Sequence, residues 1–275
     1  MDPARTEFVL DVQPASPILL FDSGFGGLTV LAELQKQLPH APVIYAADLA
    51  GIPYGPKTEA EVAARVAGLL GRLAERFHPR LICIACNTAS TIALGMVRDV
   101  LETPIVGTVP AIKPAAAMTQ TGTIGLLGTA ATIRQAYVDN LEAEFAQGKL
   151  LLRHAAPELV EAAELKLRGG TPDPAIFTRA AEGLRGQPGG DATDTVVLAC
   201  THFPLVQDEL AAAFENKVHF IDGAQGIARR IAYLTQGQSF DRQDDNFAIV
   251  TGNEQDSAPL LGGLRRYGIG RIQPL

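Results

Sequence analysis

Two cysteines occupy matching positions, each where a short apolar run ends and a stretch of helical character begins. Cys86 follows the run "LICIA" and opens "CNTAS", while Cys200 follows "TVVLA" and opens "CTHFPLV". Small polar residues come directly after both thiols, Asn and Thr after the first and Thr and His after the second. Two such junctions in one chain predict two halves that are built alike.

The position of each thiol suggests its chemistry. A cysteine at a helix N-terminus is expected to have a lowered pKa, because the positive end of the helix dipole stabilises the thiolate. An unperturbed thiol has a pKa of about 8.5, so a modest shift leaves thiolate available at neutral pH. One such thiolate can attack a carbonyl carbon. Two thiols facing one carbon can instead remove a proton from one side and return one from the other, which inverts the stereocentre.

The remaining cysteine and the other histidines suggest no redox or metal chemistry. Cys83 and Cys86 form a C-x-x-C pattern, but Cys83 falls inside an apolar run typical of a buried strand. Three cysteines are no disulfide framework. The chain lacks a second C-x-x-C or an H-x-x-x-H, so we expect no metal site. We interpret four histidines as surface or packing residues: His40, His78, His154 and His219.

Short apolar runs divide the chain at regular intervals. Several are apolar on successive residues, which is typical of strands buried on both faces of a parallel sheet. The predicted strands are 17–21, 42–47, 80–85, 104–109, 123–127, 149–154, 194–199, 218–222 and 247–251.

Helical periodicity occupies the segments between these runs. The clearest helix covers 59–77, with one apolar face formed by Val62, Val66, Leu69, Leu73 and Phe77. A four-residue spacing predicts a second helix, through Ile133, Tyr137, Leu141 and Phe145. We expect further helices over 203–215 and 224–236. The alternation of strand and helix predicts an α/β protein with right-handed crossovers.

The domain organisation follows from the position of the two junctions. We expect two similar α/β domains with mostly parallel sheets, related by a pseudo-two-fold axis, with the active site in the cleft between them. The prolines of "VPAIKP", near 109–113, favour a border there. We assign 17–110 plus 223–275 to the first domain and 111–222 to the second. Residues 1–16 are expected to be a loose N-terminal extension.

Polar residues gather where the predicted strands end. In open α/β sheets, ligands bind beyond the carboxyl ends of the strands. Any one of these residues is readily explained as a helix cap, but five such junctions at one edge favour a binding site. Helix N-termini favour anions, so a small dicarboxylate or an amino acid suits the set. The junction residues are Asp22, Ser23, Tyr54, Gly55, Thr58, Cys86, Asn87, Thr88, Thr129, Thr132, Cys200, Thr201 and His202.

Net charge and hydropathy argue against two classes of protein, nucleic-acid-binding proteins and membrane-spanning proteins. The chain has 275 residues, a net charge of -7 and no basic stripe, which argues against a nucleic-acid surface. Its apolar runs are strand-sized, well below the ~20 residues of a membrane span. The N-terminal segment lacks the apolar core of a signal peptide. We therefore expect a cytoplasmic protein, present as a monomer or a homodimer.

Four motifs, in order, connect the chain to a known family. "FDSGFGGLTVL", "IPYGPKT", "ACNTAS" and "ACTHFPLV" together resemble glutamate racemase. The resemblance runs from about residue 17 to the C-terminal region. It implies cofactor-independent conversion of L-glutamate to D-glutamate, which supplies peptidoglycan synthesis and thereby supports cell shape.

The resemblance also implies a role for each matching residue. Cys86 and Cys200 are the paired acid/base thiols, the first taking the proton from D-glutamate and the second from L-glutamate. Asp22 and His202 assist them in handling protons, and Glu161 matches an acidic position near the site. Substrate binding is implied for Asp22, Ser23, Tyr54, Gly55, Asn87, Thr88, Thr129, Thr132, Thr201 and His202.

Some sequence details depart from the common pattern of the family. Gly51 stands where a charged residue usually precedes the "PYG" motif, and "LACTHFPL" replaces the commoner "LGCTHYPL". The N-terminal extension, "VPAIKPAA" and "LACTHFP" look like the enterobacterial-type branch. Some members of that branch depend on UDP-N-acetylmuramoyl-L-alanine as an activator.

Three other functions stay open on the residues alone. The chain could be an aspartate racemase or another member of the same superfamily. It could be a thiol hydrolase or amidase, with Cys200 as nucleophile and His202 as base, which would not need Cys86. It could also be a two-domain amino-acid binding protein without catalysis.

Overall fold

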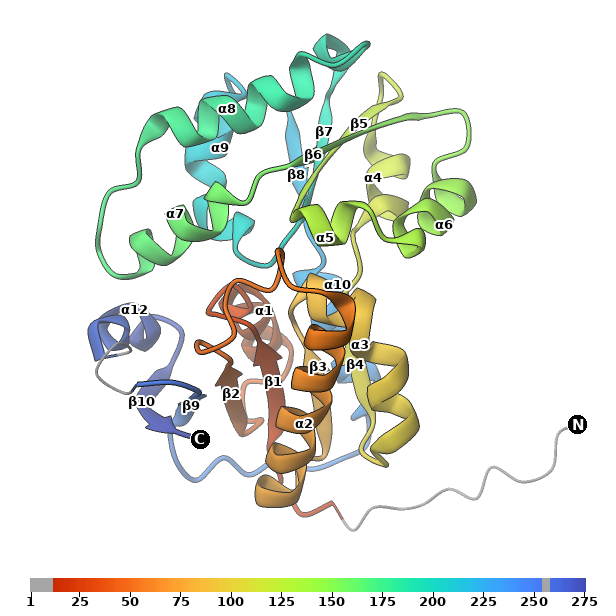
Figure 1. Ribbon diagram of the computed structural model, residues 1–275. Helices are drawn as coiled ribbons and strands as arrows, with labels where there is room; N and C mark the ends of the chain where they lie inside the picture. The colour runs from red at the N-terminus through yellow and green to blue at the C-terminus, as the bar shows by residue number, and fades with distance from the viewer. Residues whose placement is uncertain (1–11, 254–257) are drawn as a thin grey trace, which may run out of the picture.

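Two parallel sheets organise the molecule, one above the other in Figure 1. The computed structural model describes residues 12–253 and 258–275. The first sheet has the strand order β10-β9-β2-β1-β3-β4 and the second the order β6-β5-β7-β8. All the strand pairs in both sheets are parallel. The predicted fold class of two α/β domains is therefore confirmed, while the pseudo-two-fold relation stays a prediction.

Helices cover both faces of the first sheet. Its strands are β1 (Ile18–Asp22), β2 (Val43–Ala47), β3 (Leu81–Ile84), β4 (Ile105–Gly107), β9 (Asn246–Val250) and β10 (Ile269–Pro274). One face packs on α1 (Leu28–Gln37), α10 (Ala224–Leu234) and α12 (Leu261–Arg265). The other face packs on α2 (Glu59–Phe77) and α3 (Asn87–Val100). Every residue of the first three strands is buried, as their unbroken apolar runs predict.

The second sheet is smaller and is also covered on both faces. Its strands are β5 (Thr123–Gly128), β6 (Leu150–Ala155), β7 (Thr195–Ala199) and β8 (His219–Ile221). One face packs on α7 (Glu158–Leu167), α8 (Pro174–Arg185) and α9 (Gln207–Ala213). The other face packs on α4 (Ile112–Met118) and α6 (Ala136–Phe145). Three short 3₁₀ helices are η1 (Gly190–Ala192), η2 (Phe203–Val206) and η3 (Ala258–Leu260).

The chain crosses between the sheets twice. It leaves the first sheet after β4 and returns between β8 and α10, so its last strands join the first sheet. These crossings lie close to the borders that we predict at residues 110 and 223. Within the described residues, no helix combines the length and the apolar character needed to span a membrane.

The buried Arg80 holds part of the N-terminal segment against the first sheet. Its guanidinium donates to the carbonyl oxygens of Gln13, Pro14 and Ser16, at 2.8, 2.9 and 2.8 Å. It also donates to the carbonyl of Ser239, at 3.1 Å, far along the chain. Residues 13–16 are thus held in place. The expectation of a loose extension then concerns residues 1–11, which lie outside the described residues.

Three details of the secondary structure differ from the predictions. β10 was not predicted, because polar residues and Gly270 interrupt its apolar pattern. The helix expected through Ile133 and Phe145 is two helices, α5 (Ala130–Ile133) and α6. Thr129 caps α5 by accepting from the Thr132 N–H, which places this short turn at the end of β5. The helix expected over 203–215 begins as η2 and continues as α9.

Replacing the cap of α8 should weaken the second domain. Asp173 is the N-cap, and its carboxylate accepts from the Ala175 N–H at 2.9 Å. We expect Asp173→Ala to lower the free energy of unfolding by about 1 kcal/mol, measured by urea denaturation. The control is Thr178→Ala, an exposed residue of the same helix, which should change that free energy by less than about 0.5 kcal/mol. Equal losses in both variants would contradict the capping role.

Candidate active site

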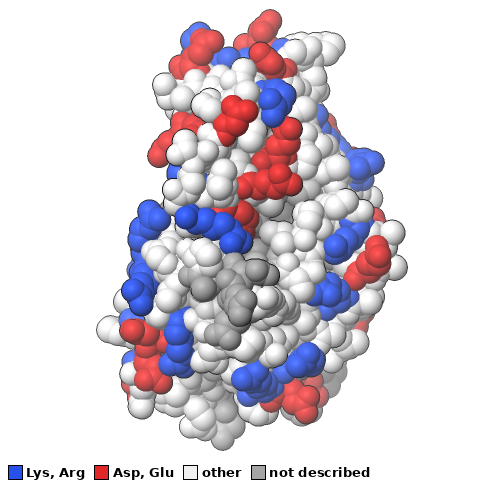
Figure 2. Space-filling view, turned by 60° about the vertical axis from the view of Figure 1, so that its left-hand side comes forward, with Lys and Arg blue, Asp and Glu red and all other residues white. Residues whose placement is uncertain are grey.

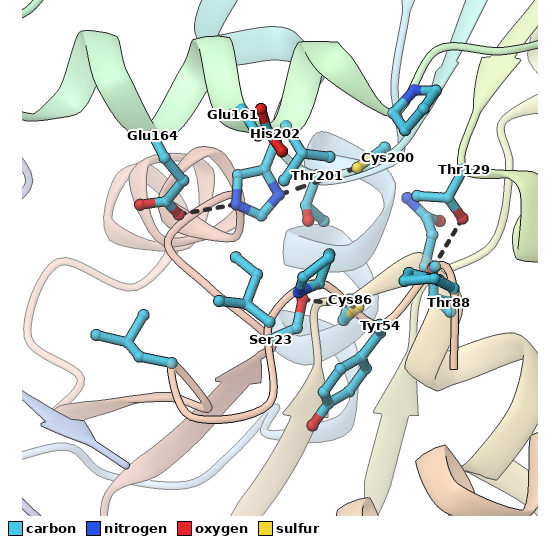
Figure 3. Close-up of a pocket in the computed structure, with 18 of the residues that line it drawn as sticks. Ser23, Tyr54, Cys86, Thr88, Thr129, Glu161, Glu164, Cys200, Thr201 and His202 are labelled. Carbon is cyan, nitrogen blue, oxygen red and sulfur yellow. Dashed lines mark hydrogen bonds and ion pairs between the residues drawn. The ribbon is translucent and has the colours of Figure 1, made fainter. Parts of the chain in front are cut away.

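A cavity of about 850 Å³ lies between the two domains, at the carboxyl ends of strands from both sheets. Cys86 lies two residues beyond the end of β3 at Ile84, and Cys200 directly follows β7. Both line this cavity. Figure 3 shows the two thiols on facing sides of the space, one from each domain. The sequence placed the two junctions far apart, and the fold brings them to one pocket.

Both thiols are nearly excluded from solvent. Cys86 is 5% exposed and Cys200 is 7% exposed. The Ser23 hydroxyl lies 3.5 Å from the Cys86 sulfur, and His202 Nδ1 lies 3.9 Å from the Cys200 sulfur. Each thiol therefore has its own polar partner: a neutral hydroxyl for Cys86 and an ionisable ring for Cys200.

The prediction of a lowered pKa is wrong for Cys86. Burial raises the pKa of its thiol far above the ordinary value, and the nearby Asp22 carboxylate raises it further. The Ala89 N–H at the start of α3 and the Ser23 hydroxyl lower it only in part. The helix N-terminus therefore does not outweigh desolvation here, and Cys86 rests as a thiol at neutral pH.

A buried ion pair supports the Cys200 side of the cavity. His202 Nε2 lies 2.9 Å from Glu164 Oε1, and the same oxygen accepts from the Phe25 N–H at 3.0 Å. Burial alone would lower the pKa of His202, but the contacts with Cys200 and Glu164 raise it well above its usual range. Burial alone would raise the pKa of Glu164, but His202 and the Phe25 N–H lower it. The imidazolium thus lies between a carboxylate and a thiol.

Sequence reasoning selected Glu161 and missed Glu164. Both lie on α7 and both line the cavity, but it is the carboxylate of Glu164 that contacts His202. Glu158, Glu161 and Glu164 recur every third residue, so they lie near one face of the helix. This three-residue spacing is the feature of the sequence that could have pointed to Glu164. It could not decide which of the three carboxylates reaches the histidine.

Asp22 is fully buried behind the cavity wall. Its carboxylate accepts from the N–H groups of Ser23 and Gly27, both at 2.6 Å, and from the hydroxyl of Thr201 at 3.1 Å. Thr201 belongs to the second domain, so Asp22 ties the two domains together beneath the thiols. Asp22, Thr58 and Thr132 are the three predicted residues that do not line the described cavity, and Thr58 instead caps α2. Their roles toward a substrate stay predictions.

Three threonine hydroxyls meet across the domain boundary. Thr88 of α3 lies 3.1 Å from both Thr129 and Thr132, which lie 3.0 Å from each other. Thr88 and Thr129 line the cavity, and Figure 3 shows their hydroxyls facing one another. Each hydroxyl can both donate and accept, so this cluster can turn its donors toward a carboxylate.

Tyr54 presents its ring rather than its hydroxyl to the cavity. Its hydroxyl donates to the buried Asp48 carboxylate at 2.6 Å, which is paired with Arg65. Burial alone would raise the pKa of Asp48, but hydrogen bonds from Arg65, Thr251 and Tyr54 lower it. Tyr54 therefore contributes an apolar wall held in place by an ion pair.

The remaining predicted residues also border the cavity. Ser23, Gly55, Asn87 and Thr201 line it together with the thiols. Arg134 and Arg168 line it as well, beside Glu161. Figure 2 shows basic and acidic side chains both bordering the hollow between the domains. Among residues 12–253 and 258–275, no cluster of His, Cys, Asp or Glu is suited to hold a metal ion.

Comparison with known proteins gives consistent matches along almost the whole chain. The sequence model of the family described as Asp/Glu/Hydantoin racemase matches residues 28–231. A glutamate racemase of Sphingopyxis alaskensis is 60% identical over 261 residues, which cover 94% of this chain and 97% of that protein. A glutamate racemase of Photorhabdus laumondii is 38% identical over 263 residues, or 94% of this chain and 90% of that protein.

Solved structures give the same result. The crystal structure of Escherichia coli glutamate racemase in complex with L-glutamate and the activator UDP-MurNAc-Ala superposes with a TM-score of 0.87. It is 38% identical and covers 94% of this chain and 98% of that chain. Glutamate racemase isoform RacE1 of Bacillus anthracis superposes with a TM-score of 0.81 at 27% identity, covering 96% of this chain and 98% of that one.

Removing the charge of Glu164 should lower the pKa of His202. Glu164→Gln keeps the shape of the side chain but takes away the negative charge that stabilises the imidazolium. The ring of His202 should therefore lose its proton at a lower pH than in the unmodified protein. An NMR titration of the histidine rings measures this, with His202→Asn used to assign the signal.

The matched control is Glu161→Gln on the same helix, which should leave the His202 titration nearly unchanged. A larger effect from Glu161→Gln than from Glu164→Gln would contradict the pairing. The pH dependence of the free energy of unfolding follows from the lowered pKa of Glu164 and the raised pKa of His202. The contribution of the pair is lost as pH falls through the lowered pKa of Glu164, and as pH rises through the raised pKa of His202.

Proposed function

The chain belongs to the Asp/Glu racemase family and, within it, to the glutamate racemases, and from this premise we propose that it interconverts L- and D-glutamate by proton transfer between Cα and two thiols. The observation that carries the proposal is that Cys86 and Cys200 line one cavity, each from a different domain. The product, D-glutamate, enters peptidoglycan synthesis, so the activity serves biogenesis of the cell wall.

The proposed reaction needs a base on one face of Cα and an acid on the other. With L-glutamate, Cys200 removes the proton and Cys86 donates its own proton to the opposite face. With D-glutamate the two thiols exchange these roles, because each must work as an acid in one direction and as a base in the other. The resting state of Cys86 as a thiol matches its role as the acid toward L-glutamate.

His202 serves the Cys200 half of this reaction. It lies 3.9 Å from that sulfur and is held by Glu164 on its other nitrogen. In this proposal the His202 ring stabilises negative charge that develops on the Cys200 sulfur, and it can accept or return a proton there. Asp22 acts at a distance in this proposal, through its hydrogen bond with Thr201 and the loop that carries Ser23.

The rest of the site holds the substrate and excludes water. Hydroxyl and amide groups of Ser23, Asn87, Thr88, Thr129 and Thr201 are the proposed partners of the two carboxylates and the ammonium group. Peptide N–H groups at the start of α3 add positive potential. Each 1.36 kcal/mol of transition-state stabilisation gives a tenfold rate increase, and preorganised donors act most strongly in a site shielded from water. No bound cofactor takes part in this scheme.

Finer assignments rest on sequence motifs and relatives. The enterobacterial-type branch is supported by identities of 38–39% with the Photorhabdus and Salmonella racemases. The more similar Sphingopyxis protein lies outside that group. The proposed cytoplasmic location is supported by the metabolic role. The domain borders at 110 and 223 are supported by the points where the chain crosses between the sheets.

The proton transfer can be tested with L-glutamate in D2O and no added cofactor. We expect racemisation with one deuterium entering at Cα of the product. Cys86→Ser and Cys200→Ser should each lower the rate of full racemisation by at least about 100-fold, in line with the loss of an acid/base group. Measurement is by circular dichroism and mass spectrometry, with D-aspartate as the competing substrate.

Cys83→Ala is the matched control, because Cys83 is fully buried in the core of the first domain. This variant should keep its activity. Normal turnover by a Cys86→Ser, Cys200→Ser double variant would show that the thiols are not the acid and base. Turnover by Cys86→Ser alone, with hydrolysis of an amide, would favour a thiol hydrolase.

Activation by a peptidoglycan precursor is a separate prediction. The E. coli glutamate racemase structure contains UDP-MurNAc-Ala as activator. The fold of that enzyme matches 94% of the present chain. We expect UDP-N-acetylmuramoyl-L-alanine to raise kcat with glutamate, while UDP alone should not. A turnover rate that is unchanged across a concentration series of the precursor would overturn this prediction.

A further inference from the structure

One helix of the second domain reaches into the core of the first. Most of the buried face of α7 packs on its own domain, through Leu159, Ala162 and Ala163. Its last residue, Leu167, is different, because it belongs to the core of the first domain together with Leu260. The side chain of Leu167 is 9% exposed. The C-terminal end of α7 is therefore attached to the opposite domain.

The attachment is close enough to involve the backbone of both segments. Gly263 of α12 is buried, and a Cβ atom built there would lie 2.6 Å from the carbonyl oxygen of Leu167. Carbon atoms of side chains do not approach a backbone oxygen this closely, so only glycine fits without a shift of α7. The helix α12 itself is fixed, since Leu264 is fully buried in the same core and α12 packs against β10.

The attached helix also carries the partner of His202. Glu164 lies one helical turn before Leu167, so an axial shift at Leu167 moves Glu164 with it. The carboxylate of Glu164 makes two contacts that such a shift would disturb, with His202 Nε2 at 2.9 Å and with the Phe25 N–H at 3.0 Å. Cys86 depends on different groups, the Ser23 hydroxyl and the Ala89 N–H, neither of which belongs to α7.

We propose that the contact between Leu167 and Gly263 positions the Glu164–His202 pair, which makes α12 a positioning element for the Cys200 half of the site. The proposal rests on the proposed function only in giving Cys200 an acid/base role. Leu167 and Gly263 are positioning residues, because they act through α7 and touch neither thiol. Their effect should therefore be selective for one of the two thiols.

Two neighbouring glycines of α12 provide a matched pair of variants. Gly263→Ala places a methyl group against the Leu167 carbonyl, whereas a Cβ on Gly262 meets nothing within 4 Å. Both substitutions raise the helix propensity of α12 by about the same amount. The difference between the two variants therefore isolates the contact with α7.

The first readout is the alkylation of each thiol by iodoacetamide across a pH series, followed by peptide mass spectrometry. We expect Gly263→Ala to change the alkylation profile of Cys200, because a displaced Glu164 moves His202 relative to the Cys200 sulfur. The profile of Cys86 should stay unchanged, and Gly262→Ala should change neither thiol. Identical Cys200 profiles in the two glycine variants, or equal shifts of both thiols in Gly263→Ala, would overturn the proposal.

The second readout is catalysis. Gly263→Ala should lower kcat/KM about tenfold or more, as expected for a misplaced catalytic group, and by the same factor for both enantiomers because they have equal free energy. The isotope effect of deuterium at Cα should rise for L-glutamate and not for D-glutamate. Because alkylation needs no substrate, a protein that fails to racemise glutamate would refute the proposed function and still test the contact.

A second pair of variants covers the case in which Gly263→Ala does not fold. Leu167→Ala removes the side chain that enters the first domain, and Leu167→Met keeps a similar volume. We expect Leu167→Ala to shift the alkylation profile of Cys200 alone and Leu167→Met to restore it. An unchanged Cys200 profile in Leu167→Ala would overturn the proposal.

Discussion

The structure depends on one geometric constraint: a carbon whose configuration is inverted must be approached from two opposite sides at once. A single sheet presents its ligand-binding edge to one side only, so two sheets have to face each other. Here each sheet supplies one thiol at the end of a buried strand. Hydrogen bonds then hold the facing edges in register, from Thr201 to Asp22 and from Phe25 to Glu164. These two contacts join the domains beside the cavity in which the thiols lie.

The two halves are alike in topology and different in electrostatics. Cys86 has a hydroxyl beside it and a carboxylate behind it, and burial first and that carboxylate second raise the pKa of its thiol. Cys200 has a histidine that a carboxylate holds in the charged form. Two sheets of similar strand order therefore carry two thiols in different electrostatic surroundings. On the Cys200 side the difference comes from His202 and from Glu164 of α7, and on the Cys86 side from Ser23 and Asp22.

The sequence was sufficient for the architecture and for most of the cavity lining. Unbroken apolar runs located the buried strands, and polar residues directly after them located the edge at which a ligand binds. The sequence was insufficient for features that depend on how side chains pack in three dimensions. Helix periodicity could not choose between Glu161 and Glu164, and a general rule for thiols at helix starts could not foresee how strongly burial acts on Cys86. Position after a strand also did not reveal that Asp22 lies behind the wall.

Arg80 shows how the fold joins two segments that lie far apart in the chain, residues 13–16 and 238–240. Burial lowers the pKa of its guanidinium, yet an arginine stays charged over the whole physiological range. Its acceptors at Gln13, Pro14, Ser16 and Ser239 are main-chain oxygens, which never titrate. It also donates to the side-chain oxygen of Gln238 at 3.0 Å, and it lies over the ring of Phe240. The contacts with residues 13, 14 and 16 therefore depend neither on acidity nor on which side chains those positions carry, whereas the segment at the other end of the chain also contributes the side chains of Gln238 and Phe240.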